Sequence, residues 1–400
     1  MKSVVILGST GSIGESALKV IAAAPERLRV VGLCARENTE RLLEQARCFG
    51  VSEVAVSDPV HAERLRGQAP ATMRVHAGPE GVCRLAALPQ ADLVLCALVG
   101  LAGLRPVLAA IEAGHDVALA TKEVLVAAGE TVMARRLAKG VRLLPIDSEH
   151  SALFQCIERS EIPCCVRLPQ ADVPANTPRS AIARLILTAS GGPFASRKKI
   201  DFARIGVEDA LRHPNWSMGR KVTIDSATMM NKGLEVMEAQ WLFGIPLERI
   251  DVLLHPESIV HGLAETVDGA MLAHLSPTDM QYAIHHALHW PVCHPSKLPR
   301  LDLSCIRALH FAPPDADRFP CLGLARQAAR IGGTCPAALN AANEVAVEAF
   351  LNGCIRFSDI WHCVEAVLST HAVGRDCSVE GVEDADAQAR AAATVWIRKQ

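Results

Sequence analysis

The chain has 400 residues, of which 50% are hydrophobic and 21% are charged. A chain of this length exceeds a single ordinary hydrophobic core, so we expect two or three domains. The formal net charge is only −2. This near-neutral balance argues against a nucleic acid or an anionic membrane as a partner.

The cysteine pattern bears on the cellular compartment. None of the fourteen cysteines forms a C-x-x-C pair, and several, such as Cys34 and Cys96, lie in apolar runs. These features predict reduced core residues rather than a disulfide framework or a zinc knuckle. The amino-terminal residues pass directly into a strand and a glycine turn, which leaves no room for a signal or transit peptide, and the longest apolar run, residues 93–104, is too short to span a bilayer. We therefore expect a soluble, cytoplasmic protein.

The first part of the chain alternates short β-rich runs with amphipathic helical segments. The predicted strands comprise residues 3–7, 29–33, 53–56, 92–99, 116–120 and 142–146, and the predicted helices comprise residues 15–24, 39–49, 104–114 and 123–138. This alternation predicts an α/β fold with a doubly wound, Rossmann-like parallel sheet. We assign residues 1–150 to this dinucleotide-binding domain.

The pattern changes after this domain. Residues 158–182 are rich in proline and polar residues and predict an irregular surface excursion, whereas strands resume at 183–190, 248–265 and 269–275. The Asp268-Gly269 turn predicts an antiparallel hairpin, so we assign residues 151–290 to a central α+β domain. The proline-rich residues 291–314 predict a linker, and the helical segments within 315–400 predict a C-terminal bundle.

A glycine-rich turn, Gly8 to Gly14, follows the first predicted strand and opens the first helix. Glycine lets a pyrophosphate approach the backbone, and a helix N-terminus supplies N–H groups. The spacing differs from G-x-G-x-x-G, so the turn fits either a dinucleotide site or an ordinary tight turn. At the end of the second strand Arg36 favours the 2′-phosphate of NADP, although Glu37 is more typical of an NAD site. NADP is therefore the predicted cofactor.

Two carboxylates, Asp147 and Glu149, follow the last predicted strand of the sheet. The carboxyl ends of parallel strands are where open α/β folds bind ligands, and side chains at i and i+2 of an extended segment point to the same side. All-oxygen ligation suits Mg²⁺ or Mn²⁺. The alternative is that Asp147 caps a helix that begins near Ser151.

The segment from Asp225 to Glu235 reads D-S-A-T-M-M-N-K-G-L-E and predicts a helix. Asn231 and Glu235 are one helical turn apart, so an amide and a carboxylate share a face with the Lys232 ammonium beside them. The donors, with Ser226, suit a phosphate, and the carboxylate suits a hard cation. One helix is therefore expected to hold both ends of a small phosphorylated substrate.

Two further segments carry candidate site residues, and two histidine groups do not. Ser190 follows a strand in L-T-A-S-G-G-P-F, either exposed in a site or part of a plain turn. In H-P-N-W-S-M-G, Trp216 and Met218 fit either a lid that excludes water or packing onto their own domain. His285 and His289 lack the glutamate of a zinc H-E-x-x-H motif, and we interpret His255 and His261 as core or supporting residues.

Together these segments resemble the 1-deoxy-D-xylulose 5-phosphate reductoisomerase family of isoprenoid precursor biosynthesis. The resemblance rests on G-S-T-G-S-I-G, A-T-K-E, D-S-E-H-S-A-L-F-Q, L-T-A-S-G-G-P-F, H-P-N-W-S-M-G-R-K, D-S-A-T-M-M-N-K-G-L-E and H-P-E-S-I-V-H-G, and A-L-N-A-A-N-E-V-A-V-E-A-F-L extends it toward the C-terminus. It implies NADPH- and metal-dependent rearrangement and reduction of a phosphorylated sugar to 2-C-methyl-D-erythritol 4-phosphate. It also implies a V-shaped homodimer in which the central domain supplies the active site and the dimer contact.

The resemblance implies site residues by position. The metal ligands would be Asp147, Glu149 and Glu235, which with Lys122 form the catalytic set. Substrate would meet Lys122, Ser148, Glu149, Ser190, His213, Ser226, Asn231, Lys232 and Glu235. The cofactor would meet Thr10, Gly11, Ser12, Ile13, Arg36, Glu37, Asn38, Thr121, Glu123 and Gly219, and the lid would contain Trp216 and Met218.

Three positions depart from the family pattern. Arg36-Glu37 stands for the usual Gly-Lys, Thr121 for the usual asparagine, and Ala189 for the usual glycine. None belongs to the implied metal triad, so the departures bear on cofactor affinity rather than on the reaction. The alternatives are another NADP-dependent oxidoreductase of a small phosphorylated or carboxylated substrate, and a non-catalytic dinucleotide sensor.

Overall fold

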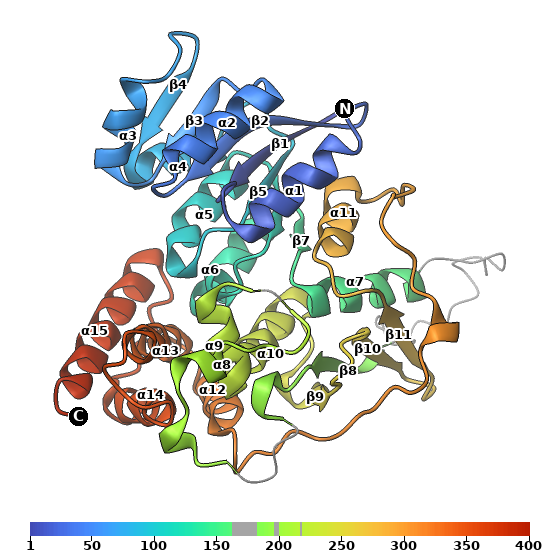
Figure 1. The fold of residues 1–400 in the computed structure, drawn as a ribbon, viewed down its shortest axis with the longest axis vertical. Helices are drawn as coiled ribbons and strands as arrows, with labels where there is room; N and C mark the ends of the chain where they lie inside the picture. Colours follow the sequence, from blue (N-terminus) through green and yellow to red (C-terminus); the bar gives the residue numbers. More distant parts are fainter. Residues whose placement is uncertain (162–181, 196–199, 217) are drawn as a thin grey trace.

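A computed structural model of the chain describes residues 1–161, 182–195, 200–216 and 218–400. The surface excursion predicted at 158–182 falls almost entirely outside these described residues. The amino-terminal part, the central sheet and the carboxy-terminal helices form three adjoining regions (Figure 1). Across the described ranges, no helix combines the length and the apolar character needed to cross a membrane.

The amino-terminal region is a parallel sheet of seven strands in the order β4-β3-β2-β1-β5-β6-β7. The strands are β1 (Lys2–Leu7), β2 (Leu28–Ala35), β3 (Glu53–Val56), β4 (Arg74–Ala77), β5 (Leu93–Cys96), β6 (Asp116–Leu119) and β7 (Leu143–Pro145). The helices are α1 (Ser12–Ala22), α2 (Thr39–Phe49), α3 (Pro59–Arg66), α4 (Gly78–Ala86), α5 (Leu104–Glu112) and α6 (Glu123–Lys139). The doubly wound α/β prediction is confirmed.

The hydrophobic pattern explains this sheet. Every residue of β5 is buried, as are five of the six residues of β1, because helices cover both faces. The edge strand β4 was not predicted, because its four residues are only half-buried or exposed and carry no apolar run. The strand order reverses between β1 and β5, which is where α/β sheets of this kind bind ligands. The turn after β1 needs glycine, since Gly8 has φ of 87° and a Cβ there would lie 2.6 Å from the Ala97 carbonyl oxygen.

The central region contains a second sheet in the order β11-β10-β8-β9. Its strands are β8 (Ile182–Ala189), β9 (Ile250–Leu254), β10 (Val260–Thr266) and β11 (Met271–Leu275), and its helices are α7 (Ser148–Glu161), α8 (Val207–Ala210), α9 (Arg220–Thr228), α10 (Met230–Phe243) and α11 (Gln281–His289). The predicted hairpin is present as the antiparallel β10–β11 pair, whose turn is closed by a bond of 2.8 Å from Thr266 N to Ala270 O. Residues 291–314 form the 3-10 turn Leu303–Cys305 and one bridge between Leu254 and Ala312.

The carboxy-terminal region is helical, as predicted, and comprises α12 (Pro320–Ile331), α13 (Cys335–Leu351), α14 (Asp359–Thr370) and α15 (Val379–Ile397). Its apolar faces do not form a separate core. One continuous cluster of buried side chains joins β8 and β9, helix α10 and the four carboxy-terminal helices. Helix α10 is thereby fixed on one side by the carboxy-terminal helices, as Figure 1 shows from the adjacent positions of α10 and α12.

The contact between α10 and α12 depends on Gly233, because a Cβ at that position would lie 2.4 Å from the Cβ of Ala325. We expect Gly233→Ala to lower the free energy of unfolding by about 1–3 kcal/mol, since the helices must separate or distort. Denaturant unfolding measures this loss. Gly323→Ala in α12 is the matched control, because no atom lies within 4 Å of a Cβ there. A loss of the same size in the control would contradict a role for the close approach.

A histidine pair on α11 predicts acid sensitivity. The rings of His285 and His289 have centroids 4.2 Å apart, and His294 lies 5.2 Å from His289. Burial, and then the neighbouring His289, His286 and His294, lower the pKa of His285 to about 4. Because the unfolded chain then binds more protons at mildly acidic pH, the stability contributed by neutral His285 is full above a pH of about 6.5 and is lost as the pH falls toward about 4.

Replacing His285 tests this linkage. We expect His285→Gln to lose less thermal stability than the parent protein between pH of about 7 and about 5, because the side chain that resists protonation is gone. Melting temperatures at the two pH values give the difference directly. Parallel pH profiles for the two proteins would contradict the assignment.

Candidate active site

A cavity of about 210 Å³ lies beside the carboxyl ends of the parallel strands, next to the second sheet. Its wall collects fifteen of the residues predicted from the sequence. They are Ser12, Ile13, Lys122, Asp147, Ser148, Glu149, Ser190, His213, Trp216, Met218, Gly219, Ser226, Asn231, Lys232 and Glu235. The fold therefore brings the predicted carboxylates, phosphate donors and lid residues to one place.

Three carboxylates converge at this cavity. Asp147 follows β7, Glu149 lies in the first turn of α7, and Glu235 lies in α10. One carboxylate oxygen from each lies within 4.8 Å of the others. The sequence argument expected Asp147 and Glu149 on one extended segment, which is wrong, because α7 begins already at Ser148. Asp147 and Glu149 are instead brought together by the end of β7 and the first turn of α7.

The proposed single helix from Asp225 to Glu235 is also corrected. The segment forms two helices, α9 and α10, which meet at Met229. Met229 adopts a left-handed conformation with φ of 63° and is almost fully buried, so packing of its side chain stabilises a break that propensity does not predict. Ser226 therefore reaches the cavity from the end of α9, and Asn231, Lys232 and Glu235 reach it from α10.

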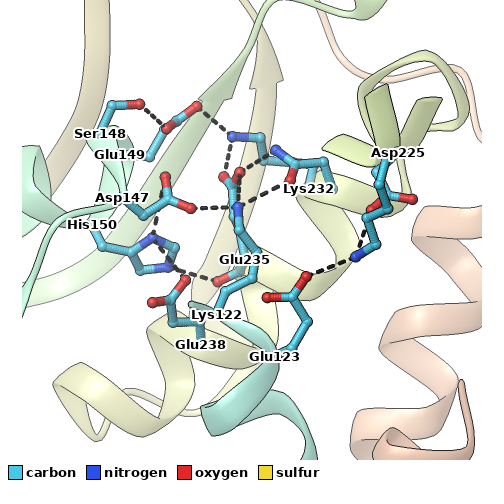
Figure 2. A network of polar contacts seen from close by, with 12 residues as sticks. Lys122, Glu123, Asp147, Ser148, Glu149, His150, Asp225, Lys232, Glu235 and Glu238 are labelled. Atoms are coloured by element: carbon cyan, nitrogen blue, oxygen red, sulfur yellow. Dashed lines mark hydrogen bonds and ion pairs between the residues drawn. The ribbon is translucent and has the colours of Figure 1, made fainter. Parts of the chain in front are cut away.

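Two buried ammonium groups bind the carboxylates (Figure 2). Lys122 Nζ contacts Asp147 and lies 2.9 Å from Glu235 Oε1. Lys232 Nζ lies 2.7 Å from Glu149 Oε1 and also contacts Glu235. The side chain of Asp147 is thus engaged with an ammonium group, which argues against the alternative that it serves only as a helix cap.

The electrostatics of the carboxylates differ from one to the next. Burial raises the pKa of Asp147, but the Lys122 ammonium outweighs burial and holds that pKa well below its usual range. Burial, together with repulsion from Glu235, raises the pKa of Glu149 to about 7, against the opposing effect of Lys232. A divalent cation beside Glu149 would favour its ionised form.

The donor set fits a hard divalent cation. Asp147, Glu149 and Glu235 offer only carboxylate oxygens, which Mg²⁺ and Mn²⁺ prefer over nitrogen or sulfur ligands. Their ligand atoms already lie close together on rigid elements, so little rearrangement is needed to share one ion. The three carboxylates line the cavity, so they would hold the ion where a ligand in the cavity could reach it.

Two of the predicted phosphate-binding residues, Ser190 and His213, contact each other in the wall of the same cavity. His213 Nδ1 accepts hydrogen bonds from Asn215 N at 3.2 Å and Trp216 N at 2.9 Å. Its proton therefore sits on Nε2, which donates to Ser190 Oγ at 2.9 Å. Burial lowers the pKa of His213 and keeps the ring neutral. The Ser190 oxygen thus accepts from His213, which leaves the Ser190 hydroxyl proton as a donor suited to an anionic oxygen.

The lid residues face the cavity and also pack on the second sheet. The Trp216 ring makes an edge contact with His261, with centroids 6.1 Å apart. Asn215 Nδ2 donates to Ser258 Oγ at 3.0 Å. The position of Trp216 therefore fits both interpretations. The ring packs against His261 of its own domain, and the side chain also lines the cavity as a lid residue would.

The residues predicted for the cofactor divide into two groups. Ser12, Ile13 and Gly219 line the cavity. The others lie outside its wall, and they are Thr10, Gly11, Arg36, Glu37, Asn38, Thr121 and Glu123. Arg36 is largely exposed and forms an ion pair of 3.0 Å with Glu37, whereas Asn38 caps α2 by accepting from Arg41 N.

Comparison with known proteins agrees with this geometry. Three family models match the chain, namely 1-deoxy-D-xylulose 5-phosphate reductoisomerase over residues 4–129, its C-terminal domain over 143–243, and the DXP reductoisomerase C-terminal domain over 275–392. The reductoisomerase of Desulfosudis oleivorans is 47% identical and covers 98% of both chains, and that of Bacillus thuringiensis is 43% identical and covers 100% of both. The chain belongs to the 1-deoxy-D-xylulose 5-phosphate reductoisomerase family.

Solved structures of the same family superpose closely. The Zymomonas mobilis reductoisomerase in complex with NADPH is 38% identical, with a TM-score of 0.88 and 100% of both chains covered. A reductoisomerase in complex with NADPH, fosmidomycin and magnesium is 40% identical, with a TM-score of 0.89 and coverage of 100% of this chain and 98% of the other.

Sequence reasoning missed part of this reductoisomerase-family site. His150 and Glu238 are fully buried next to the carboxylates, with His150 Nδ1 3.4 Å from Glu238 Oε2 and His150 Nε2 donating to the Glu235 carbonyl oxygen at 2.9 Å. Glu238 follows Glu235 by three residues on α10, and that helical spacing was the available signal. His255 and His261, interpreted as core or supporting residues, are buried as expected and also line the cavity.

Proposed function

We propose that this chain carries out the NADPH- and divalent-metal-dependent rearrangement and reduction of 1-deoxy-D-xylulose 5-phosphate to 2-C-methyl-D-erythritol 4-phosphate, a step of isoprenoid precursor biosynthesis. The observation that carries this conclusion is the convergence of three carboxylates and a set of phosphate donors on one cavity beside a dinucleotide-type turn. Membership of the family, and the NADPH and magnesium held by related structures, support the same activity.

In this proposal Asp147, Glu149 and Glu235 hold Mg²⁺ or Mn²⁺. The bound cation supplies Lewis-acid polarisation of the substrate carbonyl and stabilisation of the alkoxide or enolate that forms during carbon-skeleton rearrangement. Lys122, which contacts Asp147, Glu235 and Asn231, fixes both carboxylates and places a positive charge beside the substrate oxygens. Ser148, beside the triad, offers a hydroxyl to the same substrate.

The phosphate end of the substrate is assigned to the hydroxyl, amide, imidazole and ammonium groups that line the same cavity. Its donors are Ser190, His213, Ser226, Asn231 and Lys232. Binding a phosphate away from the reacting carbons orients the substrate and favours closure of the lid that contains Trp216 and Met218. A closed lid excludes water from the reacting carbonyl.

The cofactor is assigned to the turn after β1 and to the loops beside it. Thr10, Gly11, Ser12 and Ile13 are assigned to the pyrophosphate; the N–H of Gly11 donates to the Gly8 carbonyl oxygen at 3.1 Å, whereas Ser12 and Ile13 begin α1 and offer N–H groups at its N-terminus. Arg36, Glu37 and Asn38 lie at the end of β2, where Arg36 suits a 2′-phosphate. Thr121, Glu123 and Gly219 are assigned to further contacts with the cofactor, whose nicotinamide supplies the hydride.

The remaining features of the proposal concern the whole molecule. We assign residues 1–150 to NADPH binding, 151–290 to catalysis and dimer contact, 291–314 to a linker and 315–400 to a helical domain. We further propose a cytoplasmic homodimer without a nucleic-acid or membrane partner, in agreement with the near-neutral charge.

The decisive experiment follows the absorbance of reduced nicotinamide with 1-deoxy-D-xylulose 5-phosphate, after chelation and with or without added Mg²⁺ or Mn²⁺. We expect oxidation of NADPH only when the metal is restored, because the three carboxylates need a cation to act on the carbonyl. Metal-independent oxidation of a different small phosphorylated or carboxylated substrate would support the other NADP-dependent oxidoreductase instead. Absence of oxidation under every divalent metal would remove the proposed activity.

A further inference from the structure

We propose that Lys221 is a positioning residue that couples the cofactor side of the site to the phosphate side. It lies in α9 and ties Glu123, at the start of α6, to Asp225, next to Ser226. The inference rests on the proposed function, which assigns Glu123 to the cofactor and Ser226 to the phosphate. Nothing in the site described above assigns a role to Lys221.

Helix α9 presents two different faces. Val222 and Ser226, one turn apart, line the cavity. Lys221 and Asp225, also one turn apart, are not part of that wall and form an ion pair of 2.9 Å. The second face thus contacts the rest of the molecule while the first faces the cavity, so a shift of α9 moves both.

The ammonium of Lys221 joins separate elements. Its Nζ lies 2.7 Å from Glu123 Oε1, and the three side chains of Lys221, Glu123 and Asp225 are 18%, 10% and 1% exposed. Asp225 Oδ1 in turn accepts a hydrogen bond of 2.8 Å from Asn343 Nδ2 on α13. The chain of contacts therefore runs from the parallel-sheet region through α9 to the carboxy-terminal helices, and Figure 2 shows Glu123 and Asp225 on the two sides of the bridging contacts.

Charge makes this link specific to the ammonium. Two buried carboxylates face each other across Lys221, so without a cation between them they would repel. Burial alone would raise the pKa of Glu123, but Lys221 outweighs burial and lowers it, which keeps the carboxylate ionised. Lys221 thus sets the distance between the first turn of α6 and α9, and with it the relation of Glu123 to Ser226.

The test measures thermodynamic coupling with the full chain. The dissociation constant of NADPH is obtained from its fluorescence at saturating Mg²⁺, with and without fosmidomycin, which a related structure holds together with NADPH and magnesium. We expect fosmidomycin to tighten NADPH binding at least about fivefold in the parent protein. In Lys221→Gln the NADPH dissociation constants without and with fosmidomycin are expected to agree within about twofold, because the link between the two sides is lost.

Three controls separate this role from a general loss of structure. Lys139→Gln removes an exposed lysine of α6 that pairs with Glu112, and it should keep the parent ratio. Lys221→Arg retains the positive charge and should recover part of the coupling. Asp225→Asn keeps the Lys221–Glu123 pair and removes one of the two carboxylates that share the single Lys221 ammonium. It should therefore fold even where Lys221→Gln does not. The tightening of NADPH binding by fosmidomycin should also fall in this variant.

The outcomes are distinguishable. If Lys221→Gln folds and fosmidomycin tightens NADPH binding in it as much as in the parent protein, the positioning role is overturned. If Lys221→Gln does not fold, the same result in Asp225→Asn overturns it. A parent protein that binds both ligands without any coupling would overturn it as well. A parent protein that binds neither NADPH nor fosmidomycin would instead remove the proposed function on which the inference rests.

Discussion

Glu235→Gln is expected to lower kcat by about 10³-fold, equivalent to about 4 kcal/mol of transition-state stabilisation. Glu235 is 1% exposed, and its carboxylate contacts Lys122, Lys232 and Asn231 at the centre of the polar network. Glutamine keeps the shape but removes one of three anionic oxygens offered to the cation. The cation is then held more weakly, and its polarising effect on the carbonyl is reduced.

Two direct measurements accompany the rate for this variant. Mn²⁺ binding, followed by electron paramagnetic resonance, should weaken at least about tenfold, whereas the NADPH dissociation constant should change by less than about threefold, since Glu235 does not belong to the dinucleotide turn. Glu348→Gln, on the exposed face of α13, is the matched control and should behave as the parent protein. Unchanged turnover and unchanged Mn²⁺ affinity in Glu235→Gln would remove Glu235 from the metal triad.

Lys232→Ala is expected to raise KM for the phosphorylated substrate and to lower kcat, each by about tenfold or more. Lys232 is 3% exposed, lies on the same face of α10 as Glu235 and lines the cavity. An ammonium group that binds phosphate contributes to the bound substrate and also to the transition state, because remote binding energy is used for orientation. Initial rates over a range of substrate concentrations separate the two parameters.

The same substitution has a structural cost that must be measured beside the kinetics. Removing Lys232 leaves Glu149 and Glu235 without this ammonium, so the free energy of unfolding should fall by about 3 kcal/mol. Lys232→Arg keeps the charge and should recover most of that stability and only part of kcat, because its planar donor group differs in geometry. Competitive inhibition by inorganic phosphate should weaken in Lys232→Ala. A normal kcat with a raised KM would show that Lys232 contributes only to substrate binding.

The fold class was predictable from the sequence because the order of strands and helices, their apolar patterns and the turn residues all indicated the same arrangement. Strictly alternating apolar strands and amphipathic helices leave few arrangements other than a parallel sheet, and the Asp268-Gly269 turn specified its hairpin locally. The residues of the carboxylate group were also found, since Asp147 follows a strand and Glu235 shares a helix face with Asn231. Both signals depend on residues that are close together in the chain, so they can be read directly from the sequence.

What the sequence did not predict depends on contacts between distant segments. The break at Met229 is stabilised by burial of that side chain among residues far along the chain, so local propensity favoured one helix. The short edge strand β4 forms by pairing with β3 rather than by its own pattern. The approach of His150 to Glu238 joins α7 to α10, and the spacing of Glu238 from Glu235 on α10 does not show that His150 is its partner.

The continuous apolar cluster shared by β8, β9, α10 and the carboxy-terminal helices has a consequence for how this enzyme tolerates change. Residues outside the cavity wall, such as Leu322 and Ala325 of α12, pack against the helix that carries Lys232 and Glu235. Substitutions in the carboxy-terminal helices are therefore constrained, because they can displace Lys232 and Glu235. A chain that ended before α12 would retain every active-site residue and lose the support that holds α10 in place.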